Sequence, residues 1–135
     1  MKYSWDTDLL YSMSNFISII MRFPVRMKQP VDGEILRQAV NIAINRYPYF
    51  KQKIAVDEQG GYILLPNDEP IVVTPTAEKN PLINTAESNF QLATVDYEGN
   101  NIYFNLCHNV SNGPGMMEWV LTTLYQYVCM KEGRK

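Results

Sequence analysis

Residues 16–47 read FISIIMRFPVRMKQPVDGEILRQAVNIAINRY, and this stretch predicts a strand followed by a helix. Apolar and largely polar positions alternate along residues 16–27, which is typical of a strand with one face turned toward a core. Pro24 cannot donate a hydrogen bond to a neighbouring strand, so the strand lies at a sheet edge there or its partner is interrupted. Asp32 then caps a helix with apolar residues at helical spacing, which should end near Tyr47 because a proline follows.

The rest of the sequence predicts several short strands and a final helix. The expected strands cover residues 51–56, 62–65, 71–74, 90–96 and 102–107, and a polar surface connection covers residues 76–88. Glycine-containing turns join the first two and the last two of these strands as hairpins. The final helix has a proline in its first turn and places on one side Met116, Met117, Val120, Leu121, Leu124, Tyr125 and Val128. This order predicts an α+β fold, a two-layer α/β sandwich with helices on one face of a mixed, mostly antiparallel sheet.

The composition indicates one ordinary globular domain over residues 1–135. Hydrophobic residues make up 46% of the chain and charged residues 19%, so it can bury a core without disulfides or a structural metal. The net charge is -2 and the basic residues form no run, which argues against nucleic acid as a partner. Cys107 and Cys129 lack CxxC spacing and indicate reduced thiols, so we expect a cytoplasmic protein. We expect neither a membrane span nor a signal peptide.

The single histidine of the chain, His108, is the first candidate for chemistry. It directly follows the strand predicted at 102–107 and precedes a loop that leads into the final helix. Scaffolds of this kind place reactive groups at such strand ends, and histidine exchanges protons at neutral pH. A structural histidine bonded to nearby backbone is the alternative. One histidine without a cluster of carboxylates or thiols does not predict a metal site.

The segment from Cys107 to Gly113 reads CHNVSNG and resembles the His-His-x-x-x-Asp-Gly motif of the chloramphenicol acetyltransferase-like superfamily. That superfamily includes condensation domains of nonribosomal peptide synthetases and alcohol O-acetyltransferases. Two further blocks resemble it in the same order, VDGEILRQAV at 31–40 and RYPYFK at 46–51. The resemblance extends from about residue 14 to about residue 130.

The resemblance implies a role for each motif residue. His108 matches the second histidine, which in the family is the general base that deprotonates an acceptor hydroxyl or amine attacking a thioester. Cys107 stands in place of the first histidine. Asn112 stands in place of an aspartate that holds the motif loop by an ion pair with an arginine, so the charge is lost. Gly113 matches the glycine that leaves space for the acceptor or the pantetheine arm.

Coenzyme A or a phosphopantetheine thioester is then the co-substrate, and no permanently bound cofactor is implied. The sequence shows no phosphate-binding loop, and Arg22, Arg26 and Arg46 are scattered candidates for phosphate contacts. The donor and the acceptor are not identified by these residues.

Two other residue groups allow alternatives. Cys107 beside His108 suggests a nucleophile, but neighbours in a strand point to opposite faces, so a small buried residue is the better interpretation. The group at the start of the last helix, Met116, Met117 and Trp119, is interpreted as core, with the lining of an acyl pocket as the alternative.

The resemblance also implies that the chain is the N-terminal lobe of a two-lobed acyltransferase, whose active site lies between the lobes. We therefore expect a fragment cut at a lobe boundary, inactive by itself, with an exposed apolar face that favours a homo-oligomer. The expected partners are the second lobe or another subunit, a small-molecule acceptor and a carrier protein. One alternative is a non-catalytic lobe that acts as a binding or interaction module. Another is a small ligand-binding α+β domain with a structural histidine.

Overall fold

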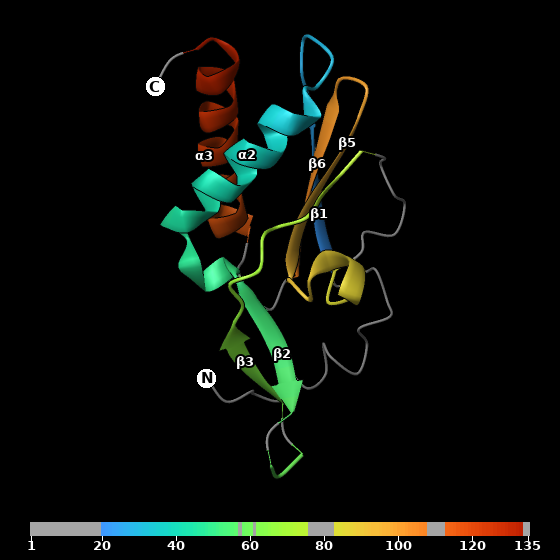
Figure 1. Ribbon diagram of the computed structural model, residues 1–135, viewed down its shortest axis with the longest axis vertical. Coiled ribbons are helices and arrows are strands. Elements are labelled where there is room, and N and C mark those ends of the chain that lie inside the picture. Colours follow the sequence, from blue (N-terminus) through green and yellow to red (C-terminus); the bar gives the residue numbers. More distant parts are fainter. Residues whose placement is uncertain (1–19, 57, 61, 76–82, 108–112, 134–135) are drawn as a thin grey trace.

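The computed structural model describes residues 20–56, 58–60, 62–75, 83–107 and 113–133, and it shows a sheet covered by two helices (Figure 1). The strands are β1 (Ile20–Arg26), β2 (Gln52–Val56), β3 (Tyr62–Pro66), β4 (Val73–Thr74), β5 (Ala93–Glu98) and β6 (Asn101–Cys107). The helices are α2 (Gly33–Ala43) and α3 (Gly113–Lys131), with short 3-10 turns at η2 (Ile44–Arg46), η3 (Pro48–Phe50) and η4 (Ala86–Ser88). The predicted α+β class is confirmed.

Four strands form the main sheet in the order β1-β6-β5-β4. The β1–β6 and β6–β5 pairs are antiparallel and the β4–β5 pair is parallel, so the sheet is mixed and mostly antiparallel as predicted. β1 is an edge strand within the described part of the chain, which accommodates Pro24 opposite Tyr103. The predicted first hairpin is also confirmed, because β2 and β3 pair antiparallel across a turn in which Gly60 has a φ of +82°.

The first strand, over its described residues, and the first helix form as the sequence predicts, and residues 16–19 of the predicted strand lie outside the described residues. Met21, Phe23 and Val25 on one face of β1 pack against the main core. The Asp32 carboxylate caps α2 by accepting a hydrogen bond from the backbone N–H of Ile35 at 3.1 Å. The helical path ends in η2, immediately before the residue that precedes proline.

The predicted face of α3 is confirmed in part, because Met116 and Val120 are buried while two other residues are exposed. Leu121 and Tyr125 were expected on the core side, but they are 59% and 72% exposed. Trp119, which was interpreted as core, is fully buried, with its ring edge-on to Phe50 at 5.6 Å and to Phe104 at 5.2 Å between centroids. α3 carries apolar residues on nearly every side, so periodicity alone does not identify its buried face. The packing of the Trp119 ring between the rings of Phe50 and Phe104 determines which face of α3 is buried.

The start of β5 also differs from the prediction. The strand was expected from residue 90, but it begins at Ala93. Asn89 and Phe90 have φ values of +57° and +59°, so the backbone is left-handed where the η4 turn ends and becomes extended only afterwards. Most of the connection predicted at 76–88 lies outside the described residues, and its described end contains the η4 turn.

Two expectations from composition concern cysteines and membranes. Cys107 and Cys129 are buried thiols that form no disulfide in the described part of the chain. Neither α2 nor α3, nor any other described helical segment, has the length and apolar character needed to cross a membrane.

Candidate functional site

The predicted site falls at the junction of β6 and α3. Cys107 is the last residue of β6 and Gly113 is the first residue of α3. His108 and Asn112 lie outside the described residues. The described ends therefore show the expected strand up to Cys107 and the expected helix from Gly113, and His108 directly follows the strand in the sequence.

The backbone that leads into His108 is held on both sides. β6 lies between β1 and β5, and Cys107 is paired with Ile20 of β1. On the other side, the Cys107 N–H donates to the carbonyl of Leu92, just before β5, at 2.8 Å. An inner strand paired to its last residue gives the next residue a fixed point of attachment.

The Cys107 side chain is buried in a small apolar cluster. It is 5% exposed and groups with Leu64 of β3 and Leu92, and Ile54 and Ile83 pack against them. Leu106, the preceding residue, belongs to the main core. This separate apolar environment supports the interpretation of Cys107 as a small buried residue and argues against a nucleophile.

The block at 46–51 packs against the first half of α3. The Tyr47 hydroxyl and Thr122 Oγ1 are hydrogen-bonded at 2.7 Å, and the Phe50 ring contacts that of Trp119. Met116 and Trp119 are 4% and 0% exposed, so their interpretation as core residues is confirmed. These contacts fix the first half of α3 relative to the η3 turn, which directly precedes β2.

Tyr49 is a site candidate that sequence reasoning missed. Its side chain is half exposed and lines a hollow of about 260 Å³, together with Lys51, Gln52 and Leu64 and with two prolines. Because Leu64 also packs with Cys107, this hollow adjoins the end of β6. Partial burial, followed by electrostatic interactions with Glu118 and Tyr47, raises the pKa of Tyr49, so its phenol stays protonated further into the alkaline range than that of an ordinary tyrosine. An aromatic residue directly after a proline is the only sequence signal for it.

Arg22 is not available to hold a phosphate. Its guanidinium donates to both Asp96 oxygens at 3.2 and 2.9 Å and to Asn105 Oδ1 at 2.6 Å. It also lies 4.4 Å from the centre of the Tyr103 ring. The candidate phosphate contact is therefore corrected to a structural role, because a paired carboxylate already satisfies the charge. Only the strand register reveals this network, so the sequence did not predict it.

A metal centre finds no support in the described residues. They contain no group of three or more His, Cys, Asp or Glu side chains that could hold an ion.

Solved structures match the chain over its whole length. The starter condensation domain of rhizomide synthetase RzmA matches with a TM-score of 0.74 at 10% sequence identity, covering 100% of this chain and 38% of that one. This chain has the fold of one condensation-domain lobe. The condensation-domain fold confirms, at the level of fold, the resemblance carried by the CHNVSNG segment. The chain spans well under half the length of these proteins.

Two further structures with the condensation-domain fold match this chain. Polyketide synthase associated protein 5 from Mycobacterium tuberculosis has a TM-score of 0.69 at 15% identity, covering 98% of this chain and 33% of that one. VibH, described as a condensation enzyme of a nonribosomal peptide synthetase, has a TM-score of 0.62 at 14% identity, covering 96% and 35%. No protein-family model and no curated protein matches the sequence.

Proposed function

We propose that the chain is the histidine-bearing lobe of an acyltransferase, which moves an acyl group from a thioester to a hydroxyl or amine. The observation that carries this proposal is the whole-length match to condensation-domain lobes. Two features of the chain support it. His108 follows a strand end that is hydrogen-bonded on both sides, and the helix required after the motif begins at Gly113.

His108 acts as the general base in this proposal. One imidazole nitrogen removes the proton of the acceptor O–H or N–H while the acceptor oxygen or nitrogen attacks the thioester carbonyl. The tetrahedral intermediate then collapses, the carbon–sulfur bond breaks, and the leaving thiolate takes up a proton. No covalent acyl-enzyme forms, so the buried Cys107 has no chemical role in this scheme.

The proposed co-substrate is coenzyme A or a phosphopantetheine thioester on a carrier protein. A variant of the rhizomide synthetase starter domain, with a TM-score of 0.72 to this chain, was solved in complex with C8-CoA. No permanently bound cofactor is needed, because the base and the thioester supply the whole reaction. The proposed setting is the cytoplasm, where coenzyme A and reduced thiols coexist.

A second lobe or another subunit completes the site in this proposal. Three large apolar side chains are exposed on the helical layer, those of Ile42, Leu121 and Tyr125. All three line a hollow of about 370 Å³ between α2 and α3. Large exposed apolar side chains on one surface are typical of association sites. The chain by itself should therefore self-associate, and light scattering with Leu121→Lys would show a smaller species.

The test is thiol release from acetyl-CoA and octanoyl-CoA with a panel of alcohols and amines. The chain is assayed alone and within the longer protein that includes the partner lobe, where one exists. His108→Ala and His108→Gln should lower acceptor-dependent release at least a hundredfold without changing the circular dichroism spectrum. Cys107→Ala should retain most of the activity.

Lys53→Ala is the matched control, because Lys53 is exposed on the β2–β3 hairpin and touches no part of the proposed reaction. Equal release from wild type and both His108 variants would refute the assignment of the base. Loss of activity in Cys107→Ala alone, in a folded protein, would instead point to covalent catalysis.

A non-catalytic lobe that binds an acyl ligand or a partner is the second candidate function. Asn112 in place of the motif aspartate and Cys107 in place of the first histidine favour it. It predicts binding of an acyl-CoA, measured by calorimetry, with no thiol release for any acceptor.

A further inference from the structure

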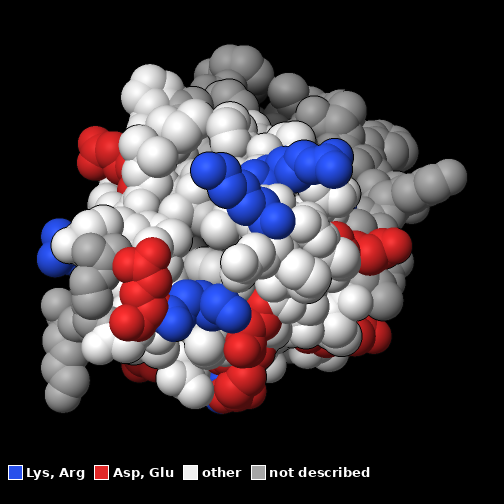
Figure 2. All heavy atoms as spheres, turned by 90° about the horizontal axis from the view of Figure 1, so that it is seen from above, with Lys and Arg blue, Asp and Glu red and all other residues white. Residues whose placement is uncertain are grey.

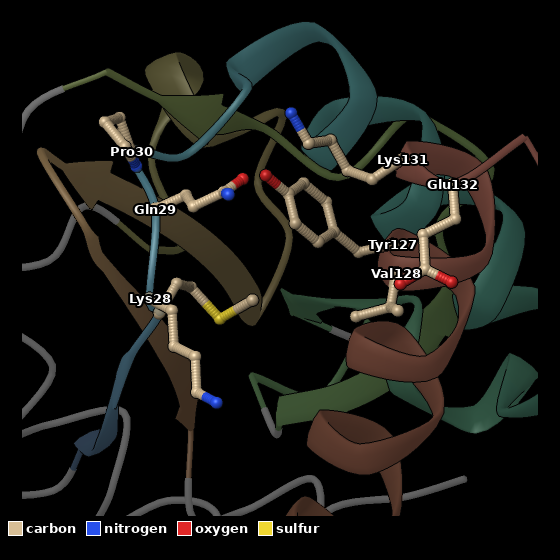
Figure 3. A pocket seen from close by; sticks show the side chains of 8 residues that line it. Lys28, Gln29, Pro30, Tyr127, Val128, Lys131 and Glu132 are labelled. Carbon is tan, nitrogen blue, oxygen red and sulfur yellow. The ribbon is translucent and has the colours of Figure 1, made fainter.

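A pocket of about 470 Å³ lies far from the motif, between the β1–α2 connection and the end of α3. Its walls are formed by Met27, Lys28, Gln29, Pro30, Tyr127, Val128, Lys131 and Glu132 (Figure 3). This volume is typical of sites for small ligands. β1 pairs with β6 from Ile20 opposite Cys107 to Arg26 opposite Asn101, so the pocket lies about 20 Å from the Cys107 end.

Hydrogen bonds hold both walls of this pocket in place. The backbone N–H of Met27 donates to the carbonyl of Asn100 at 2.7 Å, and that of Val31 donates to the carbonyl of Gly99 at 2.9 Å. On the other wall, the backbone N–H of Asp32 donates to the Tyr127 hydroxyl at 2.9 Å. The pocket is therefore preformed by the fold, which lowers the entropic cost of filling it.

The Tyr127 hydroxyl has an unused donor in this pocket. Tyr127 is 4% exposed, and its oxygen accepts the hydrogen bond from Asp32. A phenol oxygen also carries one hydrogen, and the Tyr127 hydroxyl donates no hydrogen bond to another described residue. In Figure 3 the hydroxyl points toward the head groups of Gln29 and Lys131. A hydroxyl that lines a pocket and donates to no other side chain can donate to a ligand that brings an acceptor.

Positive charge accompanies this donor. Lys28 and Lys131 line the pocket, and neither forms a salt bridge in the described part of the chain. In Figure 3 the Lys131 ammonium lies on the side of the Tyr127 hydroxyl, and the Lys28 ammonium points away from it. The one carboxylate of the lining, that of Glu132, points away from the Lys131 ammonium in Figure 3. Figure 2 views the end of the molecule on which the pocket lies, and Lys and Arg side chains lie near the middle of that face, with Asp and Glu side chains beside and below them. The surroundings favour an oxyanion.

The apolar part of the pocket lining indicates that the rest of such a ligand, beyond its oxyanion, is apolar. Met27, Pro30 and Val128 contribute apolar wall beside the donors, and the exposed lining is more apolar than polar. We propose that this pocket binds an aliphatic oxyanion, with a carboxylate or phosphate head at Lys131 and Tyr127 and an aliphatic stem along Met27 and Val128. Fatty acids and the phosphopantetheine arm both have this chemistry.

The test measures binding to the full chain by calorimetry and by amide shifts in ¹⁵N-labelled protein. Octanoate and 4′-phosphopantetheine are the two anions, and octan-1-ol and pantetheine are their neutral counterparts. At least one anion should bind, shift the amides of Lys28 and Gln29, and exceed its neutral counterpart at least fivefold in affinity. Whichever anion binds more tightly identifies the source of the ligand.

Two variants place the binding in this pocket. Lys131→Gln and Tyr127→Phe should each weaken it about fivefold or more, and Lys53→Gln, at an exposed lysine on the hairpin, should not. Lys131→Gln keeps the proposal testable if Tyr127→Phe disturbs the α2 cap. Absence of binding, equal binding of neutral and charged compounds, or unchanged affinity in Lys131→Gln would each overturn the proposal. Because His108 is not involved, these outcomes do not depend on the proposed catalysis.

Discussion

The Arg22–Asp96 ion pair should be a main source of stability for the sheet. Asp96 has a side chain only 5% exposed and Arg22 one that is 25% exposed. Removing one partner of a fully buried pair costs about 3 to 5 kcal/mol. In Asp96→Asn, partial solvation of Arg22 and its remaining bond to Asn105 should reduce the loss to about 2 to 3 kcal/mol. For a chain of this length that corresponds to a fall in Tm of about 7 to 11 °C.

Urea unfolding followed by tryptophan fluorescence measures this loss, because Trp119 lies buried between two aromatic rings. The double variant Arg22→Met/Asp96→Asn should cost about 1 kcal/mol less than the sum of the single variants. Glu34→Gln, which removes the exposed ion pair with Arg37, is the matched control and should leave stability unchanged. A loss below about 0.5 kcal/mol in Asp96→Asn, or additive losses in the cycle, would refute the reasoning.

Two further changes test the fold. Gly33→Ala should destabilise the protein by about 1 to 3 kcal/mol in urea unfolding, because the added Cβ would overlap the Tyr97 ring; Tyr97→Ala in the same chain should recover part of that loss. Tyr49 has a raised pKa when folded, so the unfolded chain releases this proton first and stability should fall as pH rises above about 10. Tyr49→Phe should make that fall shallower, and identical pH profiles would contradict the raised pKa of Tyr49.

The sequence correctly predicted the elements that are marked by local signals: alternation of apolar residues, a proline in a strand and a capping carboxylate. Alternation placed Met21 and Phe23 on the core face of β1, and Pro24 predicted an edge strand or an interrupted partner, of which the structure shows the edge strand in the described part of the chain. The carboxylate of Asp32 marked the start of α2 because it satisfies a backbone N–H that the helix leaves free. Each of these signals acts within a few residues of the chain.

Features that depend on distant contacts were not predictable in this way. The buried face of α3 is set by the Trp119 ring between Phe50 and Phe104, which come from two other elements. The bonding of Arg22 to Asp96 requires the register of three strands. The resemblance predicted the position of the candidate site. The structure agrees with this position, because a strand ends directly before it and a helix begins directly after it. His108 and Asn112 themselves stay predictions, because they lie outside the described residues.

Position 107 carries a cysteine where the resembled motif has its first histidine, and the apolar surroundings of Cys107 suit this smaller side chain. Replacing Cys107 by histidine should therefore improve neither the stability nor the activity of the protein. The Cys107 side chain packs with Leu64 and Leu92 and is 5% exposed, so Cys107→His would bury a larger polar ring in an apolar cluster. Overpacking and an unsatisfied ring nitrogen should together cost about 2 to 4 kcal/mol in urea unfolding, without a gain in thiol release. Cys107→Val, which keeps an apolar side chain, is the control and should cost under about 1.5 kcal/mol. If Cys107→His were as stable as wild type and more active, the cluster would have room for a polar side chain, and the first motif position would contribute directly to catalysis.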